Sequence, residues 1–184
     1  CQGETSVFLD SDSRPLRPAI IWCDTRALQE AKEIVDAFGS TTIQHHTGQV
    51  GCDALWPGAK LIWIRKNEPE IFRNIAHILQ LNGYFAYLLT GKMAEDDSML
   101  GSSIYWNIRM RQYWDEMLEY IGITKAQLPQ IVRPGSIVGQ ITKEAAANFG
   151  LPETMTVNIG GSDLACGPVG TGAIHPGSFS DSTG

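Results

Sequence analysis

The sequence predicts a single α/β domain, because short apolar runs typical of strands alternate with amphipathic segments typical of helices. Its 184 residues suit one domain and are few for two. Hydrophobic residues make up 43% and charged residues 18% of the chain, which is the composition of a folded globular protein. A chain of this length can bury roughly 70% of its unfolded surface, so we expect a substantial core and no extended disorder.

The N-terminal part predicts two strands and one helix. Residues 6–9 and 19–22 carry β-branched and aromatic side chains on either side of a polar turn, which indicates a hairpin or two neighbouring strands. Apolar residues then recur at helical spacing, so that a helix capped by Asp24 should end at Gly39. Residues 41–57 show no periodicity and are predicted to form a loop.

The middle of the chain predicts two helices around a strand. One helix should begin near Gly58 and end by Pro69. Residues 77–81 are typical of a buried strand, and an apolar face that begins at Tyr84 predicts a helix closed by Gly91.

Loops and short elements are predicted further along. Residues 96–107 are polar and rich in serine, which indicates a loop with a short strand at 104–106. An amphipathic helix over residues 113–121 is followed by a strand at 138–141 and a helix over 142–149.

The last part of the chain has the strongest local pattern. Residues 156–159 predict a buried strand, and residues 160–163 form a glycine turn. Residues 164–169 are then expected to start a packed helix, and residues 178–180 a final strand.

Charge, hydropathy and cysteine usage exclude several classes of protein. The formal charge of −6 argues against a nucleic-acid partner, and no apolar run approaches 18 residues, so no membrane-spanning helix is expected. The scattered cysteines form no CxxC pair and are expected to be buried thiols of a reducing compartment, which favours the cytoplasm. They are Cys1, Cys23, Cys52 and Cys166. Neither end has the polar tail of a natural terminus, so we expect a piece of a longer protein.

Asp163 is the leading candidate for chemistry. It follows two glycines at the end of an apolar strand and precedes a predicted helix, the place where ligands bind in open α/β sheets. A carboxylate there can accept a proton from a substrate hydroxyl. The alternative is that Asp163 only caps the helix, and its position alone does not decide between the two.

Two further polar groups could contact a ligand. Gln2 and Glu4 lie at the edge of the first strand and offer an amide and a carboxylate, which together recognise hydroxyl groups well. An exposed strand end explains them equally well. Asp24 and Arg26 follow the second strand, where a helix cap with a local ion pair is as good an explanation.

Other constellations do not complete a known site. His45, His46 and Asp53 fit no standard zinc spacing, so no metal site is predicted. Residues 167–172 are rich in glycine but lack the Lys-Ser/Thr of a P-loop and the Rossmann order. His175 could complete a hydrolase only with a GxSxG elbow, which the sequence does not contain.

Six segments, taken in chain order, carry a resemblance to a known family. They are Gln2-Gly3-Glu4, Arg17-Pro18-Ala19-Ile20-Ile21-Trp22-Cys23-Asp24-Thr25-Arg26, Lys60-Leu61-Ile62-Trp63 with Asn67-Glu68-Pro69-Glu70, residues 84–91 followed by Asp96 and Ser98, Gly160-Gly161-Ser162-Asp163, and Ser182-Thr183-Gly184. Their content and order resemble the FGGY family of carbohydrate kinases over nearly the whole chain.

The resemblance implies a ribonuclease H-like, actin-type ATPase fold. Residues 1–184 would be part of the N-terminal, substrate-binding domain of a two-domain sugar kinase, incomplete at both ends. The family's opening phosphate loop and its ATP-binding C-terminal domain have no counterpart in this sequence.

The resemblance also implies roles for individual residues. Asp163 would be the general base, and Thr183 and Gly184 would begin a loop that binds the phosphates of the cofactor. The substrate-binding residues that it implies are Gln2, Glu4, Trp56, Asn82 and Asp163. Gly3 replaces an arginine of glycerol kinases, which argues against glycerol as the substrate.

The function expected from this resemblance is ATP- and Mg²⁺-dependent phosphorylation of a sugar or sugar alcohol. The alternative is a non-catalytic sugar-binding or regulatory protein on the same scaffold. A dehydrogenase-type nucleotide binder is disfavoured because the Rossmann order is missing. A homodimer is implied by the family likeness alone.

Overall fold

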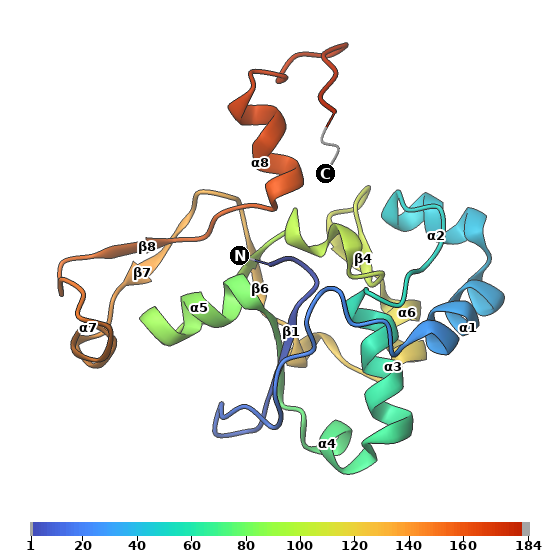
Figure 1. The fold of residues 1–184 in the computed structure, drawn as a ribbon, viewed down its shortest axis with the longest axis horizontal. Coiled ribbons are helices and arrows are strands. Elements are labelled where there is room, and N and C mark those ends of the chain that lie inside the picture. The colour runs from blue at the N-terminus through green and yellow to red at the C-terminus, as the bar shows by residue number, and fades with distance from the viewer. Residues whose placement is uncertain (1, 182–184) are drawn as a thin grey trace.

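The computed structural model describes residues 2–181 and shows a mixed α/β fold (Figure 1). The helices are α1 (Leu28–Phe38), α2 (Ser40–Thr47), α3 (Pro57–Asn67), α4 (Pro69–Asn74), α5 (Leu81–Thr90), α6 (Asp115–Ile121), α7 (Lys143–Phe149) and α8 (Asp163–Gly170), with short 3₁₀ helices η1 (Met99–Ser102) and η2 (Lys125–Gln127). The strands are β1 (Ser6–Leu9), β2 (His77–Gln80), β3 (Ala94–Asp96), β4 (Trp106–Asn107), β5 (Gln112–Tyr113), β6 (Gln130–Val132), β7 (Ile137–Gln140) and β8 (Thr156–Asn158).

The strands of the described residues are hydrogen-bonded in pairs. β1 runs antiparallel to β2, with Ser6 opposite Gln80 and Leu9 opposite His77. β3 and β6 are parallel, whereas β4 with β5 and β7 with β8 are antiparallel. The register of the first pair matters for the site, because it places the end of β2 beside the chain that leads into β1.

The main core lies around α3, whose residues are buried almost from end to end. Phe8 of β1, Ile34 of α1 and Ile121 of α6 are each fully buried in the same apolar cluster as the side chains of α3. Burying a large apolar side chain of this kind contributes about 1.5–3 kcal/mol. The core therefore fixes β1 and α3, the two elements that lie beneath the N-terminal segment.

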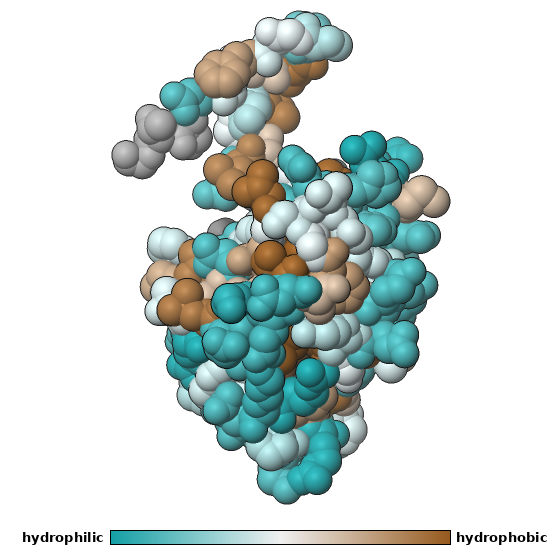
Figure 2. Space-filling model, turned by 90° about the vertical axis from the view of Figure 1, so that its right-hand side faces the viewer, coloured by the Kyte–Doolittle hydropathy of each residue, from teal (hydrophilic) through white to brown (hydrophobic). Residues whose placement is uncertain are grey.

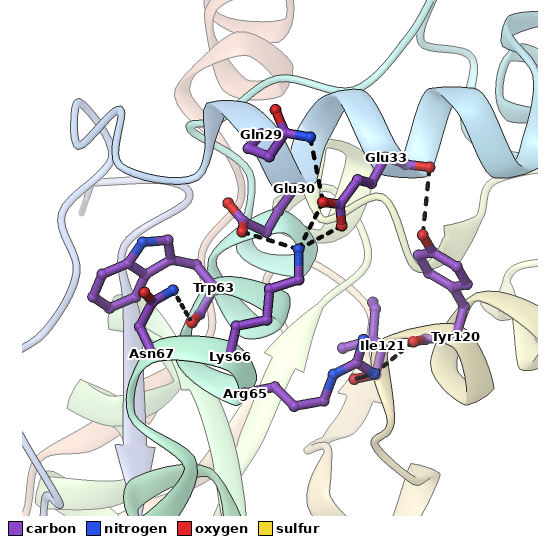
Figure 3. A network of polar contacts seen from close by, with 9 residues as sticks. All are labelled: Gln29, Glu30, Glu33, Trp63, Arg65, Lys66, Asn67, Tyr120 and Ile121. Atoms are coloured by element: carbon purple, nitrogen blue, oxygen red, sulfur yellow. Dashed lines mark hydrogen bonds and ion pairs between the residues drawn. The ribbon is translucent and has the colours of Figure 1, made fainter.

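Polar contacts join α1, α3 and α6 at the surface of this core (Figure 3). Lys66 of α3 pairs with Glu33 at 2.6 Å and with Glu30 at 3.2 Å, both on α1. Arg65 donates to the carbonyl oxygens of Tyr120 and Ile121, each at 2.7 Å. Arg65 thereby satisfies carbonyls at the C-terminal end of α6, which have no partner within the helix.

Most of the predicted elements are present with small differences in their bounds. Glycine follows four of the described helices in the left-handed conformation, as at Gly91 (φ 74°) after α5. Thr142 caps α7 and accepts a hydrogen bond from the N–H of Ala145 at 3.1 Å. The strand predicted at 77–81 corresponds to β2.

Two helices were not predicted. Residues 41–57 do not form a loop throughout, because they contain most of α2. Ile43 is the one large apolar residue of α2 and is buried in the core. A single apolar residue gives no periodicity from which the helix could be predicted. The helix predicted to end by Pro69 does so, because α3 ends at Asn67. The second unpredicted helix is α4, which begins at Pro69, a position where the missing N–H of proline is not needed.

The second predicted strand is also wrong. Of residues 19–22, Ile20 pairs with Ser6 as an isolated bridge, and the chain then turns, with the N–H of Asp24 donating to Ile21. Asp24 does not cap α1. Its carboxylate bonds Arg26 instead, and the helix begins at Leu28.

The segment after β8 differs most from the prediction. β8 is mostly exposed, residues 178–180 form no strand, and no side chain of α8 is buried. Figures 1 and 2 show this segment standing off the body of the molecule. Its large apolar side chains are exposed: Leu164, Val169, Ile174 and Phe179. The sequence predicted a packed helix from these residues, but nothing among residues 2–181 covers them.

The burial of the cysteine thiols and the hydropathy of the helices can be compared with the predictions. Cys23 and Cys166 are exposed, so the prediction of buried cysteines is wrong for both, whereas Cys52 is partly buried and burial raises the pKa of its thiol to about 12. No helix among residues 2–181 is long and apolar enough to cross a membrane.

Candidate active site

A cavity of about 450 Å³ lies where the N-terminal segment meets η1 and the start of α8. Its lining residues are Gln2, Gly3, Glu4, Trp22, Ser98, Met99, Ser102, Ser162, Asp163 and Leu164. The fold thus brings together Gln2, Glu4 and Asp163, three of the predicted site residues, from opposite ends of the sequence.

Asp163 is the first residue of α8 and is exposed at the cavity. Its Oδ1 atom accepts hydrogen bonds from the N–H of Leu164 at 3.0 Å and the hydroxyl of Ser162 at 3.3 Å. The N-cap position belongs to Ser162, and no side chain caps the helix there. Asp163 is therefore not the N-cap residue, although its carboxylate accepts from a free N–H group in the first turn of α8.

A chain of hydrogen bonds ties the glycine turn to the body of the molecule. The hydroxyl of Ser98 accepts from the N–H of Ser162 at 2.9 Å and donates to Asp96. Asp96 is fully buried at the end of β3 and also accepts from the N–H groups of Ser98 and Met99 at 3.0 and 3.2 Å. Ser98 thus holds the residue next to Asp163, a role that the sequence did not reveal.

The opposite wall of the cavity is the segment before β1. The amide oxygen of Gln2 accepts from the hydroxyl of Thr5 at 3.2 Å, and that hydroxyl accepts from the N–H of Trp22 at 3.1 Å. Trp22 is 47% exposed and faces the cavity. An exposed tryptophan directly after an apolar run was the signal that could have identified it.

The other predicted site residues lie elsewhere. Trp56 is the N-cap residue of α3 and packs against the core, and it is absent from the described lining of the cavity. Asn82 donates to Asp96 at 3.2 Å and supports the site from behind. Thr183 and Gly184 lie outside the described residues, so their predicted role is not addressed.

The electrostatics of the cavity are acidic. Among its described lining residues the charged ones are Glu4 and Asp163. The nearest buried cation is Lys60, whose ammonium group lies behind the wall and bonds backbone oxygens of Glu4 and Ile21. Burial lowers the pKa of Lys60 to about 8. Two carboxylates with several hydroxyls and an amide suit a neutral, hydroxyl-rich ligand.

Beside the cavity, Arg26 holds Asp24 in a two-pronged ion pair, and its guanidinium lies 4.8 Å above the ring of Trp63. The hydrogen bonds from Arg26 lower the pKa of Asp24 to about 2. Because this value is below that of the unfolded chain, the pair stabilises the fold above about pH 4, and the stabilisation is lost as the pH falls towards 2.

We expect Arg26→Met to raise the pKa of Asp24 towards 3.8, the ordinary value. A carboxyl titration by NMR would measure the change. The control is Arg14→Met, which removes an exposed pair with Asp12 and should leave the pKa of Asp24 unchanged. An unchanged pKa in the Arg26 variant would contradict the assigned cause.

Comparison with known proteins decides the family. Residues 1–170 match the model of the FGGY family of carbohydrate kinases, N-terminal domain. The chain belongs to the FGGY family of carbohydrate kinases. The resemblance stated from the sequence motifs is therefore confirmed.

Individual FGGY relatives agree with this assignment. The chain is 32% identical to the xylulose kinase of Haemophilus influenzae over 174 residues, covering 93% of this chain and 35% of the relative. It is also 32% identical to the xylulose kinase of Escherichia coli, covering 94% of this chain and 35% of that protein. The chain thus spans about a third of the length of these relatives.

Solved FGGY structures confirm the fold class. The ligand-bound xylulose kinase from Lactobacillus acidophilus superposes with a TM-score of 0.86 at 25% identity, covering 94% of this chain and 35% of that one. A glycerol kinase from Plasmodium falciparum has the same TM-score of 0.86 at 23% identity, which supports the fold alone. The predicted α/β fold of an N-terminal, actin-type kinase domain is confirmed.

A second cavity adjoins the first and bears on the cofactor that FGGY kinases use. It measures about 330 Å³ and shares Asp163 and Leu164 with the first. Its remaining lining residues are Gly167, Pro168, Thr171, Ser180 and Asp181. Glycine and hydroxyl side chains leave room for phosphate oxygens, but Asp163 and Asp181 would repel a bare phosphate, so the residues fit the phosphate end of a nucleotide only as its Mg²⁺ complex.

The metal that accompanies such a nucleotide needs little from the protein. Among residues 2–181 no group of three or more His, Cys, Asp or Glu could hold an ion. Mg²⁺ commonly takes one or two carboxylates and completes its shell with water and phosphate. Asp181 at the second cavity fits that pattern.

Proposed function

We propose that this chain forms the sugar-binding part of an ATP-dependent carbohydrate kinase that transfers a phosphoryl group to a hydroxyl of a neutral sugar or polyol. The observation that carries the proposal is the convergence of Asp163 with Gln2 and Glu4 on one cavity. These residues are about 160 positions apart in the sequence, and hydroxyl recognition and proton transfer both require their side chains together.

In this proposal each wall of the cavity has its own task. Glu4 and Gln2 bind hydroxyl groups of the sugar and orient one of them towards Asp163. The Asp163 carboxylate accepts the proton of that hydroxyl as its oxygen forms the new bond to phosphorus. Trp22 offers an apolar surface to the sugar's C–H groups and excludes water from that side.

ATP and Mg²⁺ complete the reaction. When bound, Mg-ATP supplies the phosphoryl group and neutralises its charge. The second cavity supports placing the phosphates of Mg-ATP beside Asp163, with a hydroxyl donor from Ser180.

The substrate class follows from the charge of the lining. Glu4 and Asp163 would repel a carboxylate ligand, and no described lining residue offers a compensating cation. Ketoses and polyols are therefore favoured over aldonates. The relatives named as xylulose kinases make xylulose the first ketose to test, and Gly3 argues against glycerol.

The test is ATP consumption by the full-length protein with Mg²⁺ against a panel of ketopentoses, polyols, glycerol and gluconate. We expect turnover of one neutral ketose or polyol, with kcat/KM for gluconate lower by about a hundredfold or more, the scale of a like-charge contact in a binding site. Preferred turnover of gluconate would refute the substrate class. Sugar binding without turnover would favour the non-catalytic alternative.

The cysteine thiols bear on where the protein is located in the cell. The unpaired thiols of Cys23, Cys52 and Cys166 support a reducing compartment, and we propose the cytoplasm. A homodimer stays a prediction from the family likeness.

A further inference from the structure

Lys60 is fully buried in the middle of the core, although lysine is rarely buried without a partner. Its ammonium group donates to the carbonyl oxygen of Glu4 at 3.0 Å and to that of Ile21 at 2.8 Å. Both acceptors are backbone atoms next to cavity residues, since Ile21 precedes Trp22. The cost of burying this charge is therefore offset by bonds to the wall of the cavity.

Gln80 completes the arrangement from the other side. This side chain is 2% exposed at the end of β2. Its amide oxygen accepts from the N–H of Glu4 at 3.1 Å, and its amide nitrogen donates to the carbonyl oxygen of Met99 at 2.9 Å. The N–H and the C=O of Glu4 are thus both held by buried side chains from other elements.

The backbone of Glu4 needs such support. Its φ is 59°, in the left-handed region that is unfavourable for a residue with a Cβ atom. Conformations of this kind persist only where the surroundings determine them. Glu4 lines the cavity in this conformation, and an extended backbone would turn its side chain in another direction.

We propose that Lys60 and Gln80 are positioning residues of the sugar site, a backbone clamp that holds Glu4 in the left-handed conformation with its carboxylate at the cavity. The clamp also fixes the segments of Trp22 and Met99, so two buried side chains align three parts of the wall. This inference rests on the proposed sugar kinase activity, because it concerns how the same site is shaped.

The first test is Lys60→Met in the full-length enzyme, which removes the ammonium group and keeps the length of the side chain. We expect KM for the sugar to rise by about tenfold or more, the scale of a misplaced binding group, while KM for ATP changes less than about twofold. The matched control is Lys66→Met on the same helix, whose partners Glu30 and Glu33 lie on α1 (Figure 3). None of these three residues is among the described lining residues of the cavity. The control variant should leave both KM values unchanged.

A double-mutant cycle separates positioning from a general loss of structure. If Lys60 acts through Glu4, Lys60→Met should raise the sugar KM by about tenfold in the wild-type background but by less than about twofold in a Glu4→Ala background. Equal increases in both backgrounds would overturn the proposal.

Amide hydrogen exchange tests the clamp without reference to activity. The N–H of Glu4 should exchange at least about tenfold faster in Lys60→Met and in Gln80→Leu than in wild type, whereas the N–H of Leu16, bonded to Phe8 at 2.9 Å, should not change. Unchanged exchange at Glu4 would overturn the clamp. A wild-type enzyme that phosphorylates no sugar but shows this pattern would count against the proposed function alone.

Discussion

Asp163→Asn is expected to lower kcat by about a thousandfold in the full-length enzyme, because general-base catalysis contributes about 10²–10⁴-fold and the amide cannot accept the proton. Asparagine has the same shape, and its amide oxygen can still accept from the N–H of Leu164, the bond that Asp163 makes at 3.0 Å. The turn should therefore be retained, and KM for the sugar should change little. Steady-state kinetics with the substrate identified in the panel would measure both quantities.

The control for this variant is Asp36→Asn. Asp36 pairs with Lys32 at 3.6 Å on the exposed surface of α1. No residue of α1 is among the described lining residues of the cavity. The kcat of this variant should equal that of wild type. A loss smaller than about tenfold in Asp163→Asn would remove this residue from the role of base and leave it a binding contact.

Gly58→Ala is expected to destabilise the fold by about 1–3 kcal/mol, the usual cost of overpacking a core. An added Cβ atom would lie 2.3 Å from Cγ2 of Ile104 and 3.1 Å from both Cδ1 of Ile121 and the carbonyl oxygen of Ser103. Ile104 has little freedom to move, because it is fully buried with a φ of 72°, which is rare for a β-branched residue.

Urea unfolding would measure this effect as a lower midpoint with an unchanged m value. Gly101→Ala is the matched control, because no atom lies within 4 Å of its Cβ position and its φ is not positive. Equal stability of the Gly58 and Gly101 variants would show that α3 can shift away from Ile104 at no cost.

The elements that could be predicted from the sequence are those whose signals are local. Gly91 and Thr142 mark the end of α5 and the start of α7 through bonds made within four residues. The wrongly predicted elements are those whose structure depends on contacts with residues distant in the sequence. Residues 19–22 have the composition of a strand, yet the bridge to Ser6 uses Ile20 alone. The apolar residues of α8 are covered by nothing among residues 2–181.

The residues of the candidate site also fall into those that the sequence predicted and those that it did not. Asp163, Gln2 and Glu4 lie at strand edges and were candidates on that ground, and the fold brings them to one cavity. Ser98 and Lys60 were not identified, because their importance depends on bonds to residues more than fifty positions away. Asn82 was placed at the cavity by the family resemblance, but it contacts Asp96 instead.

Among the described residues, the absence of buried side chains in α8 has a consequence for the local stability of the two walls of the cavity. The wall that carries Glu4 is tied to the core, because buried Lys60 of α3 and Gln80 of β2 bond the backbone of Glu4. The helix that begins with Asp163 is tied to the body through the Ser98 hydroxyl and the backbone on either side. Within residues 2–181, α8 can therefore open locally without disrupting the core.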